Sequence, residues 1–371
     1  MKKNSNLIGR VKGKRPGKSK EREALTIGLD LGDKMSHYCV LAGDGEKLYE
    51  GKVATNKQAL AEVFGTLSKC RIALEVGTHS PWVSRLLASQ GHEVIVANAR
   101  QVKLITQSSR KNDKLDAQTL ARLARVDPQL LRPIQHRSEE AQQELMVIRV
   151  RAALVEARTA LVNHARGLAK AVGERIPKCD ADSLAVERLN GLPAGLRGVL
   201  QPVVKEVESL TEKIQHCDKE IEQIAREKYP ETELLRQVSG VGALIALTFV
   251  LTVEDATRFR KSRDVGCYVG LRPKRSDSGE SQPQVGISKE GDVYLRKLLV
   301  QCAQYILSRK GPDTDLKRWG LQIAAKGKKK AKRRAVVAVA RKLAIVLHRL
   351  WVSGERYEPR RQRETRKAVA A

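Results

Sequence analysis

The sequence predicts a mixed α/β domain followed by long helices and a mainly helical C-terminal region, and three observations support this prediction. Short apolar runs typical of strands alternate with amphipathic helices between residues 24 and 135. From residue 138 onward, helix formers replace strand formers. The 371 residues are 41% hydrophobic, which is enough to build real cores. A chain of this length typically divides into two or three domains.

The first domain is expected to span residues 24–135, with strands and helices in a defined order. The run Ala24 to Asp30 is a buried strand that ends in a carboxylate. Further strands are expected at 36–42, 46–53, 71–76 and 92–97, and helices at 57–67, 81–89 and 114–125. Three strands in succession, followed by alternating helices and strands, indicate a mixed sheet. The preceding residues 1–23 are basic and lack periodicity, so we expect a disordered arm that is either merely solvated or contacts phosphates.

Residues 136–230 are expected to form a helical linker that contains a coiled coil. Within it, eight apolar residues recur at alternating spacings of three and four, a 3.5-residue period: Leu200, Val203, Val207, Leu210, Ile214, Cys217, Ile221 and Ile224. This period is typical of a left-handed coiled coil. The partner helix is either the helix at 138–172 of the same chain, as an antiparallel hairpin, or a helix of a second copy.

Residues 231–355 are expected to form a C-terminal helical domain, and residues 356–371 a basic tail. The stretch Val238 to Ala246 contains Gly240 and Gly242 and has the form of a helix-hairpin-helix turn. Such a turn presents backbone N–H groups at a helix start, where they can bind phosphate. The alternative is a turn with no ligand.

The charge of the chain points to a polyanionic partner. Lys and Arg number 70 against 42 Asp and Glu, which gives a net charge of +28. Nucleic acid is the leading candidate, and a merely solvated basic surface is the alternative. Aromatic residues make up only 4%, which argues against binding mainly by base stacking.

The remaining composition excludes several other classes of protein. The six cysteines contain no C-x-x-C pair, which argues against a disulfide framework and a structural zinc site. We see no signal-peptide core, and the most apolar run, 243–253, is too short to span a bilayer. We therefore expect a cytoplasmic protein with no membrane partner.

Four carboxylates are candidates for a catalytic metal site. Asp30 and Glu75 lie at or near the ends of two strands, and Asp113 and Asp116 are three residues apart at a helix start. If the two strands are neighbours, a helix packed across their edge brings all four acids together. Such a cluster repels itself unless cations occupy it, and hard oxygen ligands suit Mg²⁺ or Mn²⁺. Alternatively, each acid only caps a turn or a helix.

These motifs resemble a known family. The stretches I-G-L-D-L-G at 27–32, A-L-E-V-G at 73–77 and K-N-D-K-L-D-A at 111–117 resemble the ribonuclease H-like domain of Holliday-junction resolvases. More closely, they resemble the DEDD transposases of insertion sequences, the RNA-guided bridge recombinases. The resemblance runs from about residue 25 to 351. It implies a ribonuclease H-like (RuvC-like) domain whose metal ligands are Asp30, Glu75, Asp113 and Asp116.

A second set of motifs resembles the C-terminal module of the same transposases. It comprises G-L-R-P at 270–273, S-G at 278–279 and I-S-K-E-G at 287–291 followed by Leu295 and Arg296. The resemblance implies that Ser278 is the nucleophile that attacks a DNA phosphate, with Ser276 as its competitor. From the residues alone, Ser278 and Gly279 form a turn. Cations that could offset phosphate charge nearby are Arg272, Lys274, Arg275, Lys289 and Arg296.

The resemblance implies a DNA transposase or site-specific recombinase that works through a covalent phosphoserine and is helped by Mg²⁺. It also implies a guide RNA, association with the nucleoid, and a homo-oligomer, a dimer or tetramer, in which one protomer's acids meet another's serine. A neighbouring alternative is a Holliday-junction-type endonuclease that hydrolyses with water. A third is a non-catalytic nucleic-acid-binding scaffold.

Overall fold

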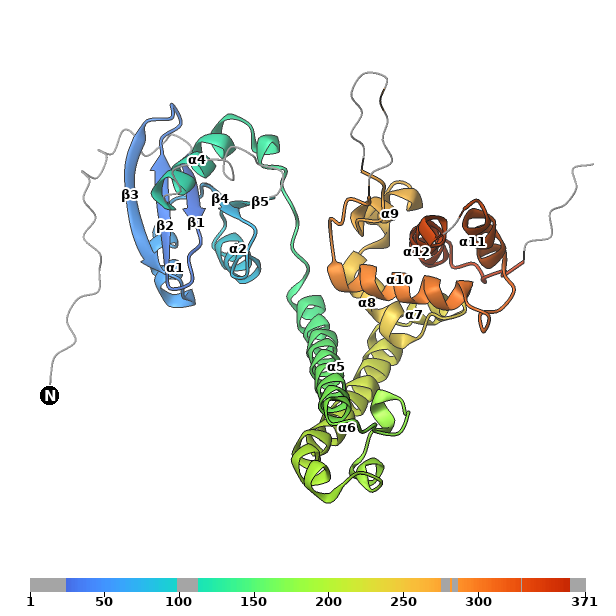
Figure 1. Ribbon diagram of the computed structural model, residues 1–371. Coiled ribbons are helices and arrows are strands. Elements are labelled where there is room, and N and C mark those ends of the chain that lie inside the picture. The colour runs from blue at the N-terminus through green and yellow to red at the C-terminus, as the bar shows by residue number, and fades with distance from the viewer. Residues whose placement is uncertain (1–24, 99–112, 275–280, 282–285, 328, 361–371) are drawn as a thin grey trace, which may run out of the picture. The chain divides into compact units, whose positions relative to one another are not determined.

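The computed structural model describes residues 25–98, 113–274, 281, 286–327 and 329–360, with the backbone alone at 113 and 114. The basic arm at 1–23 and most of the tail at 356–371 therefore lie outside the described residues. The chain forms two compact units, Met1–Arg137 and Ser138–Ala371 (Figure 1). In the described part of the chain, no helix combines the length and the apolar character needed to cross a bilayer.

The described part of the first unit is built on a five-stranded mixed sheet in the order β3-β2-β1-β4-β5. The strands are β1 (Thr26–Asp30), β2 (Met35–Leu41), β3 (Lys47–Ala54), β4 (Arg71–Glu75) and β5 (Glu93–Ala97). β1, β2 and β3 pair antiparallel, whereas β1, β4 and β5 pair parallel. The predicted mixed sheet is confirmed.

Helices cover both faces of this sheet. α1 (Lys57–Phe64) and α2 (Ser80–Ser89) pack on one face, where β1 contributes Ile27 and Leu29 to the core. α4 (Asp113–Val126) packs on the other face, against Ala73 of β4 and Cys39 of β2. Since side chains alternate along a strand, Gly28 between Ile27 and Leu29 faces α4. A short 3₁₀ helix at Pro128–Leu131 follows.

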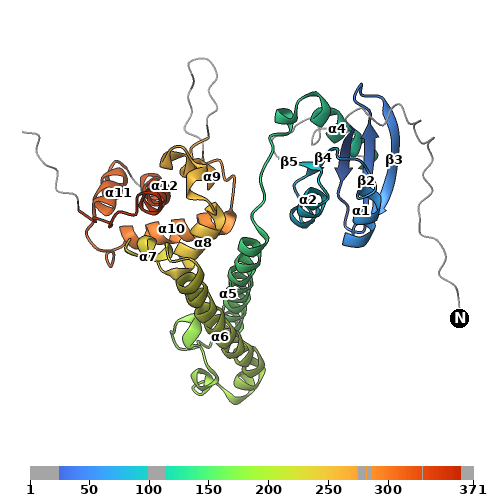
Figure 2. The same ribbon diagram turned by 180° about the vertical axis from the view of Figure 1, so that it is seen from behind.

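Two long antiparallel helices begin the second unit, α5 (Glu139–Ala171) and α6 (Ala194–Lys228) (Figure 2). The start of α5 packs against the end of α6, and the end of α5 against the start of α6. Six of the eight residues in the expected seam are buried, and Val203 and Ile224 are half-buried. The α6 seam therefore packs against α5 of the same chain. Short 3₁₀ helices at Ala181–Ser183 and Val186–Leu189 lie in the connection.

α8 (Ala243–Val253) joins the helix pair to the C-terminal bundle. One of its faces, which includes Leu247 and Leu251, packs on α5 and α6, whereas Phe249 and Val253 enter the bundle core. The apolar run at 243–253 is thus a helix buried between the α5–α6 pair and the C-terminal bundle. The bundle also contains α7 (Thr232–Arg236), α9 (Val265–Tyr268), α10 (Val293–Leu307), α11 (Asp315–Ala325) and α12 (Lys329–Ser353), with 3₁₀ turns at Ala256–Arg258 and Ser262–Asp264. The mainly helical C-terminal region is confirmed.

Candidate active site

Asp30 and Glu75 end two neighbouring parallel strands. The register of β1 and β4 pairs Leu29 with Leu74, and the next residue on each strand is one of the two acids. Register partners in parallel strands project to the same face. Asp30 lies two residues after Gly28 and Glu75 two residues after Ala73, so both acids lie on the face that α4 covers. Both side chains are half-buried.

The close approach of α4 brings its first turn to this same edge. A Cβ on Gly28 would lie 1.9 Å from the carbonyl oxygen of Ala117, so glycine permits this contact. Farther along α4, the carbonyl of Ala124 accepts a hydrogen bond from Arg71 at the start of β4, at 3.1 Å. α4 therefore runs opposite to β1 and β4, and its N-terminus lies at their carboxyl edge.

Helix and strand geometry sets which residues of α4 reach the acids. Two strand residues span about 6–7 Å, and a helix covers that length in about four residues. Four residues before Ala117 is position 113, which places the backbone of Asp113 level with Asp30. Asp116 is half-buried on the same turn. The side chain of Asp113 lies outside the described residues.

The described carboxylates are oxygen donors that suit a hard divalent cation, but they do not form a complete metal site. Among the residues whose side chains the structure describes, no group of three or more His, Cys, Asp or Glu converges closely enough to hold a metal. That set includes Asp30, Glu75 and Asp116 but not Asp113. All four expected ligands are oxygen donors, and the positive end of the α4 dipole lies at their edge.

Three histidines of the first unit were identified by no sequence motif, and one of them lies beside an expected metal ligand. His37 on β2 is the register partner of Asp30. His79, after β4, lies 3.6 Å from Asp33, after β1, so an ion pair links the two loops when His79 is protonated. His136 Nε2 lies 2.9 Å from the hydroxyl oxygen of Ser80. Burial, and the nearby Arg85 and Arg137, lower the pKa of His136. Only the strand register and loop packing reveal these neighbours.

In the second unit, a short antiparallel stem carries the loop that contains the expected nucleophile. The Lys274 N–H donates to the carbonyl of Gly286 at 2.8 Å, and the Ser288 N–H donates to that of Arg272 at 2.9 Å. The residues Arg275, Ser276 and Ser278 lie in this loop, outside the described residues.

The base of the stem is held by two glycines and one arginine. Gly270 and Gly291 have positive φ, and a Cβ on Gly291 would lie 1.9 Å from the carbonyl oxygen of Tyr268. The guanidinium of Arg296 donates to the carbonyls of Val269 and Glu290 at 3.1 and 2.8 Å. Arg296 thus fixes the stem by hydrogen bonds to its backbone. The exposed Lys289 side chain lies on the same stem.

The two glycines before α8 have different surroundings. Gly240 has a φ of 89°, and a Cβ there would lie 2.7 Å from Tyr305, so its contact with α10 demands glycine. Gly242 is the exposed N-cap residue of α8 and has open space beside it. Both glycines are exposed, but only Gly240 packs closely against α10.

The architecture is consistent with a DEDD, ribonuclease H-like domain joined to a helical module. A family model for transposases, of the DEDD IS110 type, matches residues 27–173. A second model, the transposase IS116/IS110/IS902 family, matches residues 232–317. The chain belongs to the DEDD transposases of insertion sequences. It is thus an enzyme that cleaves and recombines DNA. Its DEDD domain indicates dependence on a divalent metal.

Curated relatives agree with this assignment. The chain is 28% identical to the transposase for insertion sequence element IS1111A of Coxiella burnetii, over 89% of this chain and 90% of the relative. It is 27% identical to the transposase for insertion sequence element IS1328 of Yersinia enterocolitica, over 76% and 84%. It is 29% identical to a probable family 20 transposase of Pseudomonas aeruginosa, over 79% and 87%.

Proposed function

We propose that this transposase cuts and rejoins DNA through a covalent bond between Ser278 and a DNA phosphate, assisted by a divalent metal bound at Asp30, Glu75, Asp113 and Asp116. One observation supports the metal site above all others. Asp30 and Glu75 end adjacent parallel strands, on the face where the first turn of α4 arrives. Mg²⁺ is the proposed ion, and Mn²⁺ has the same preference for oxygen ligands.

The carboxylates and Ser278 have different roles in the proposed reaction. A divalent ion bound by the carboxylates supplies positive charge that stabilises the phosphate as it is attacked. The Ser278 hydroxyl oxygen forms a bond to phosphorus, and the bond from phosphorus to the leaving strand's sugar oxygen breaks. The serine proton is lost and the leaving oxygen gains one. A hydroxyl of another strand then attacks the phosphoserine, so the strands rejoin and Ser278 is released without ATP.

The proposal includes further partners of the chain. The acids belong to one sequence module and the serine to another, and we propose that the active site assembles from two protomers of a homo-oligomer on DNA. A structured guide RNA is proposed as a second nucleic-acid partner. The net charge of +28 supports binding to two polyanions. Gly242 at the start of α8 is a proposed phosphate contact, together with Arg272, Lys274, Arg275 and Lys289.

Trapping the protein–DNA bond tests the proposal. Purified protein is incubated with DNA from the element ends, the flanking RNA and Mg²⁺, and adducts are resolved on denaturing gels. We expect adducts on the wild type and on Ser276→Ala but none on Ser278→Ala. Adducts on Ser278→Ala but not on Ser276→Ala would assign the nucleophile to Ser276.

The same experiment separates the alternative functions. A metal-dependent endonuclease that uses water would cut DNA in every serine variant and never form an adduct. A non-catalytic scaffold would bind DNA but leave it uncut, with or without Asp30 and Glu75. Either outcome contradicts the proposed mechanism.

A further inference from the structure

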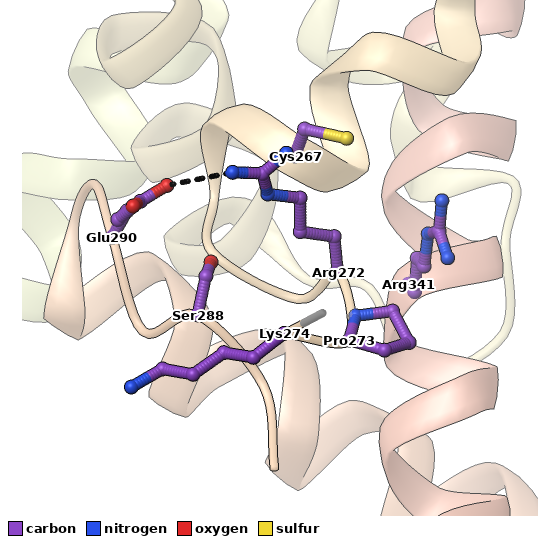
Figure 3. Close-up of a pocket in the computed structure, with 7 residues that line it drawn as sticks. All are labelled: Cys267, Arg272, Pro273, Lys274, Ser288, Glu290 and Arg341. Atoms are coloured by element: carbon purple, nitrogen blue, oxygen red, sulfur yellow. Dashed lines mark ion pairs between the residues drawn. The ribbon is translucent and has the colours of Figure 1, made fainter. Parts of the chain in front are cut away.

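A basic pocket lies at the base of the stem that carries the loop at 275–285. Its volume is about 650 Å³, within the range of about 300–1,000 Å³ typical of ligand pockets. It therefore has room for more than a single ion. The described residues that line it are Cys267, Arg272, Pro273, Lys274, Ser288, Glu290 and Arg341 (Figure 3).

The charged side chains in this pocket leave an excess of positive charge. Arg272, Lys274 and Arg341 are cationic, and Glu290 is anionic. Arg272 lies 3.8 Å from Glu290, a loose ion pair between two half-exposed side chains. Neither Lys274 nor Arg341 has an ion pair within the part of the chain that the structure describes. Among the described residues, two positive charges of the pocket therefore have no acidic partner.

Arg341 comes from α12, far along the chain from the other cations, and its position is fixed by packing. Gly266 in α9 lies against its side chain, because a Cβ on Gly266 would be 2.9 Å from the Arg341 Cγ. Figure 3 shows Arg341 rising from α12 on the side of the pocket opposite Glu290. The family models match residues 27–173 and 232–317, so Arg341 lies outside both ranges.

Two polar atoms of the pocket residues are buried and find no hydrogen-bond partner among the described residues, the Nε of Arg341 and the Oγ of Ser288. Both can donate a hydrogen bond, and a buried donor without an acceptor costs about 1–3 kcal/mol. An anion that reaches either donor would remove that donor's share of the cost. Arginine binds phosphate oxygens in a forked geometry, which lysine does not provide.

We propose that this pocket binds a backbone phosphate of the DNA strand on which the transposase acts, with Arg341 and Ser288 as hydrogen-bond donors and Arg272 and Lys274 as neighbouring cations. The proposal deepens the proposed function and rests on it, since the covalent chain keeps Ser278 close to this pocket. Ser278 is four positions after Lys274, which limits the distance between their Cα atoms to about 14 Å. The bound phosphate is therefore within a few nucleotides of the attacked one. Arg341 acts as a positioning residue, not as a catalytic residue.

Substitution of Arg341 with a matched control tests the pocket. Arg341→Gln removes the charge and the fork, and Lys342→Gln removes a charge from the next residue, which lies over the Trp319 ring at 4.4 Å. Full-length protein is titrated against a labelled element-end DNA duplex at several KCl concentrations. We expect Arg341→Gln to weaken binding about tenfold and to reduce the slope of log K against log salt by about one. We expect Lys342→Gln to change binding less than twofold, and Arg341→Lys to restore the slope but only part of the affinity.

The outcomes separate this proposal from others. Equal affinity and slope for Arg341→Gln and the wild type would overturn it. A loss confined to a matched RNA duplex would also overturn it, because the pocket would then serve RNA. Should Arg341→Gln fail to fold by circular dichroism, Ser288→Ala provides the second variant, with a smaller loss of affinity and an unchanged slope expected.

Adduct formation distinguishes failure of the pocket from failure of the serine mechanism. Wild-type protein that forms no adduct, while Arg341→Gln still weakens DNA binding, would contradict the mechanism and support the pocket. Unchanged binding by Arg341→Gln together with normal adducts would contradict the pocket and support the serine mechanism.

Discussion

Gly28 of β1 lies directly against the carbonyl oxygen of Ala117 in α4, and a Cβ at position 28 would be 1.9 Å from that oxygen. The helix can approach the sheet this closely because position 28 has no side chain. The same approach brings the first turn of α4 to the edge where Asp30 and Glu75 end their strands. One glycine thus couples the packing of the domain to the geometry of its candidate active site.

We therefore expect Gly28→Ala to destabilise the first unit. The added methyl overlaps backbone that cannot move without shifting α4, and overpacking of this kind costs about 1–3 kcal/mol or more. DNA cleavage should fall together with the thermal unfolding midpoint. Gly77→Ala is the control, because nothing lies within 4 Å of a Cβ there. Equal unfolding midpoints for the two variants would contradict the close contact.

The acids at the sheet edge should be essential for cleavage but not for folding. We expect Asp30→Asn and Glu75→Gln to lower cleavage by about 10²–10⁴-fold, because a bound metal contributes several kcal/mol to the transition state. A chelator should abolish cleavage by the wild type. Glu93→Gln, at the start of β5 and paired with Arg71 at 2.9 Å, is the control at the opposite edge and should retain activity. Full cleavage by Asp30→Asn would show that cleavage does not require the proposed metal site.

The seam between α5 and α6 should stabilise the chain without a second copy. Ile221 is 1% exposed and packs against the start of α5. We expect Ile221→Ala to cost about 2–5 kcal/mol, as buried Ile-to-Ala changes do. Val199→Ala on the same helix removes an exposed side chain and should cost little. Denaturant titrations at two protein concentrations give the readout, and a loss that depends on concentration would indicate an intermolecular seam instead.

Cys70 should be an inert thiol despite its histidine neighbour. Its Sγ lies 3.3 Å from Nδ1 of His92, whose Nε2 lies 3.1 Å from the Phe64 carbonyl oxygen and donates to it. Burial raises the pKa of Cys70 to about 11. At pH 8 we expect mass spectrometry to show slow alkylation of Cys70 and faster alkylation of the half-exposed Cys179. Rapid alkylation of Cys70 would contradict its burial.

The same pKa shift predicts how stability depends on pH. In the unfolded chain the Cys70 thiol has its ordinary pKa of about 9, whereas in the folded chain burial raises this pKa to about 11. Its contribution to stability is therefore complete below pH 9 and is lost as the pH rises toward 11. Cys70→Ala should show a shallower fall in unfolding midpoint over this window than the wild type.

Binding to DNA should depend steeply on salt. The net charge of +28 implies that phosphate contacts dominate the affinity. For 6–10 such contacts, we expect affinity to fall by about 10³–10⁵ between 50 and 200 mM salt. Titrations at four salt concentrations measure the slope. A slope near zero would show that the positive charge serves some other purpose.

Much of the fold could be predicted from local patterns. The strand that ends at Asp30, the helix that begins after Ser138 and the seam through Ile214 all follow from spacing and capping, which are local properties. Strand order does not follow from local patterns, because the pairing of β1 with β4 joins residues more than forty positions apart. The partner of the α6 seam does not follow from local patterns either, since the same apolar stripe fits α5 or a second copy equally well.

Some residues of the candidate site could likewise be predicted from local patterns, and others could not. Acids, glycines and serine were identified from motifs, whereas His37, His79 and Arg341 carry no local signal. His37 lies beside Asp30 only through strand register, and Arg341 lines the pocket only because α12 packs on α9. The structural role of Arg296, which binds two backbone carbonyls, also depends on a folded stem.

The amino-acid sequence by itself determined the types of element, the excess of positive charge and the residues proposed to bind a metal or attack a phosphate. These follow from composition and short-range periodicity, which need no knowledge of distant neighbours. The tertiary structure alone decided that β1 lies beside β4, that α4 docks on Gly28 and that Arg341 and Ser288 line the same pocket. Contacts of this kind depend on packing between distant segments, where shape and volume act together and no single stretch of sequence specifies the outcome.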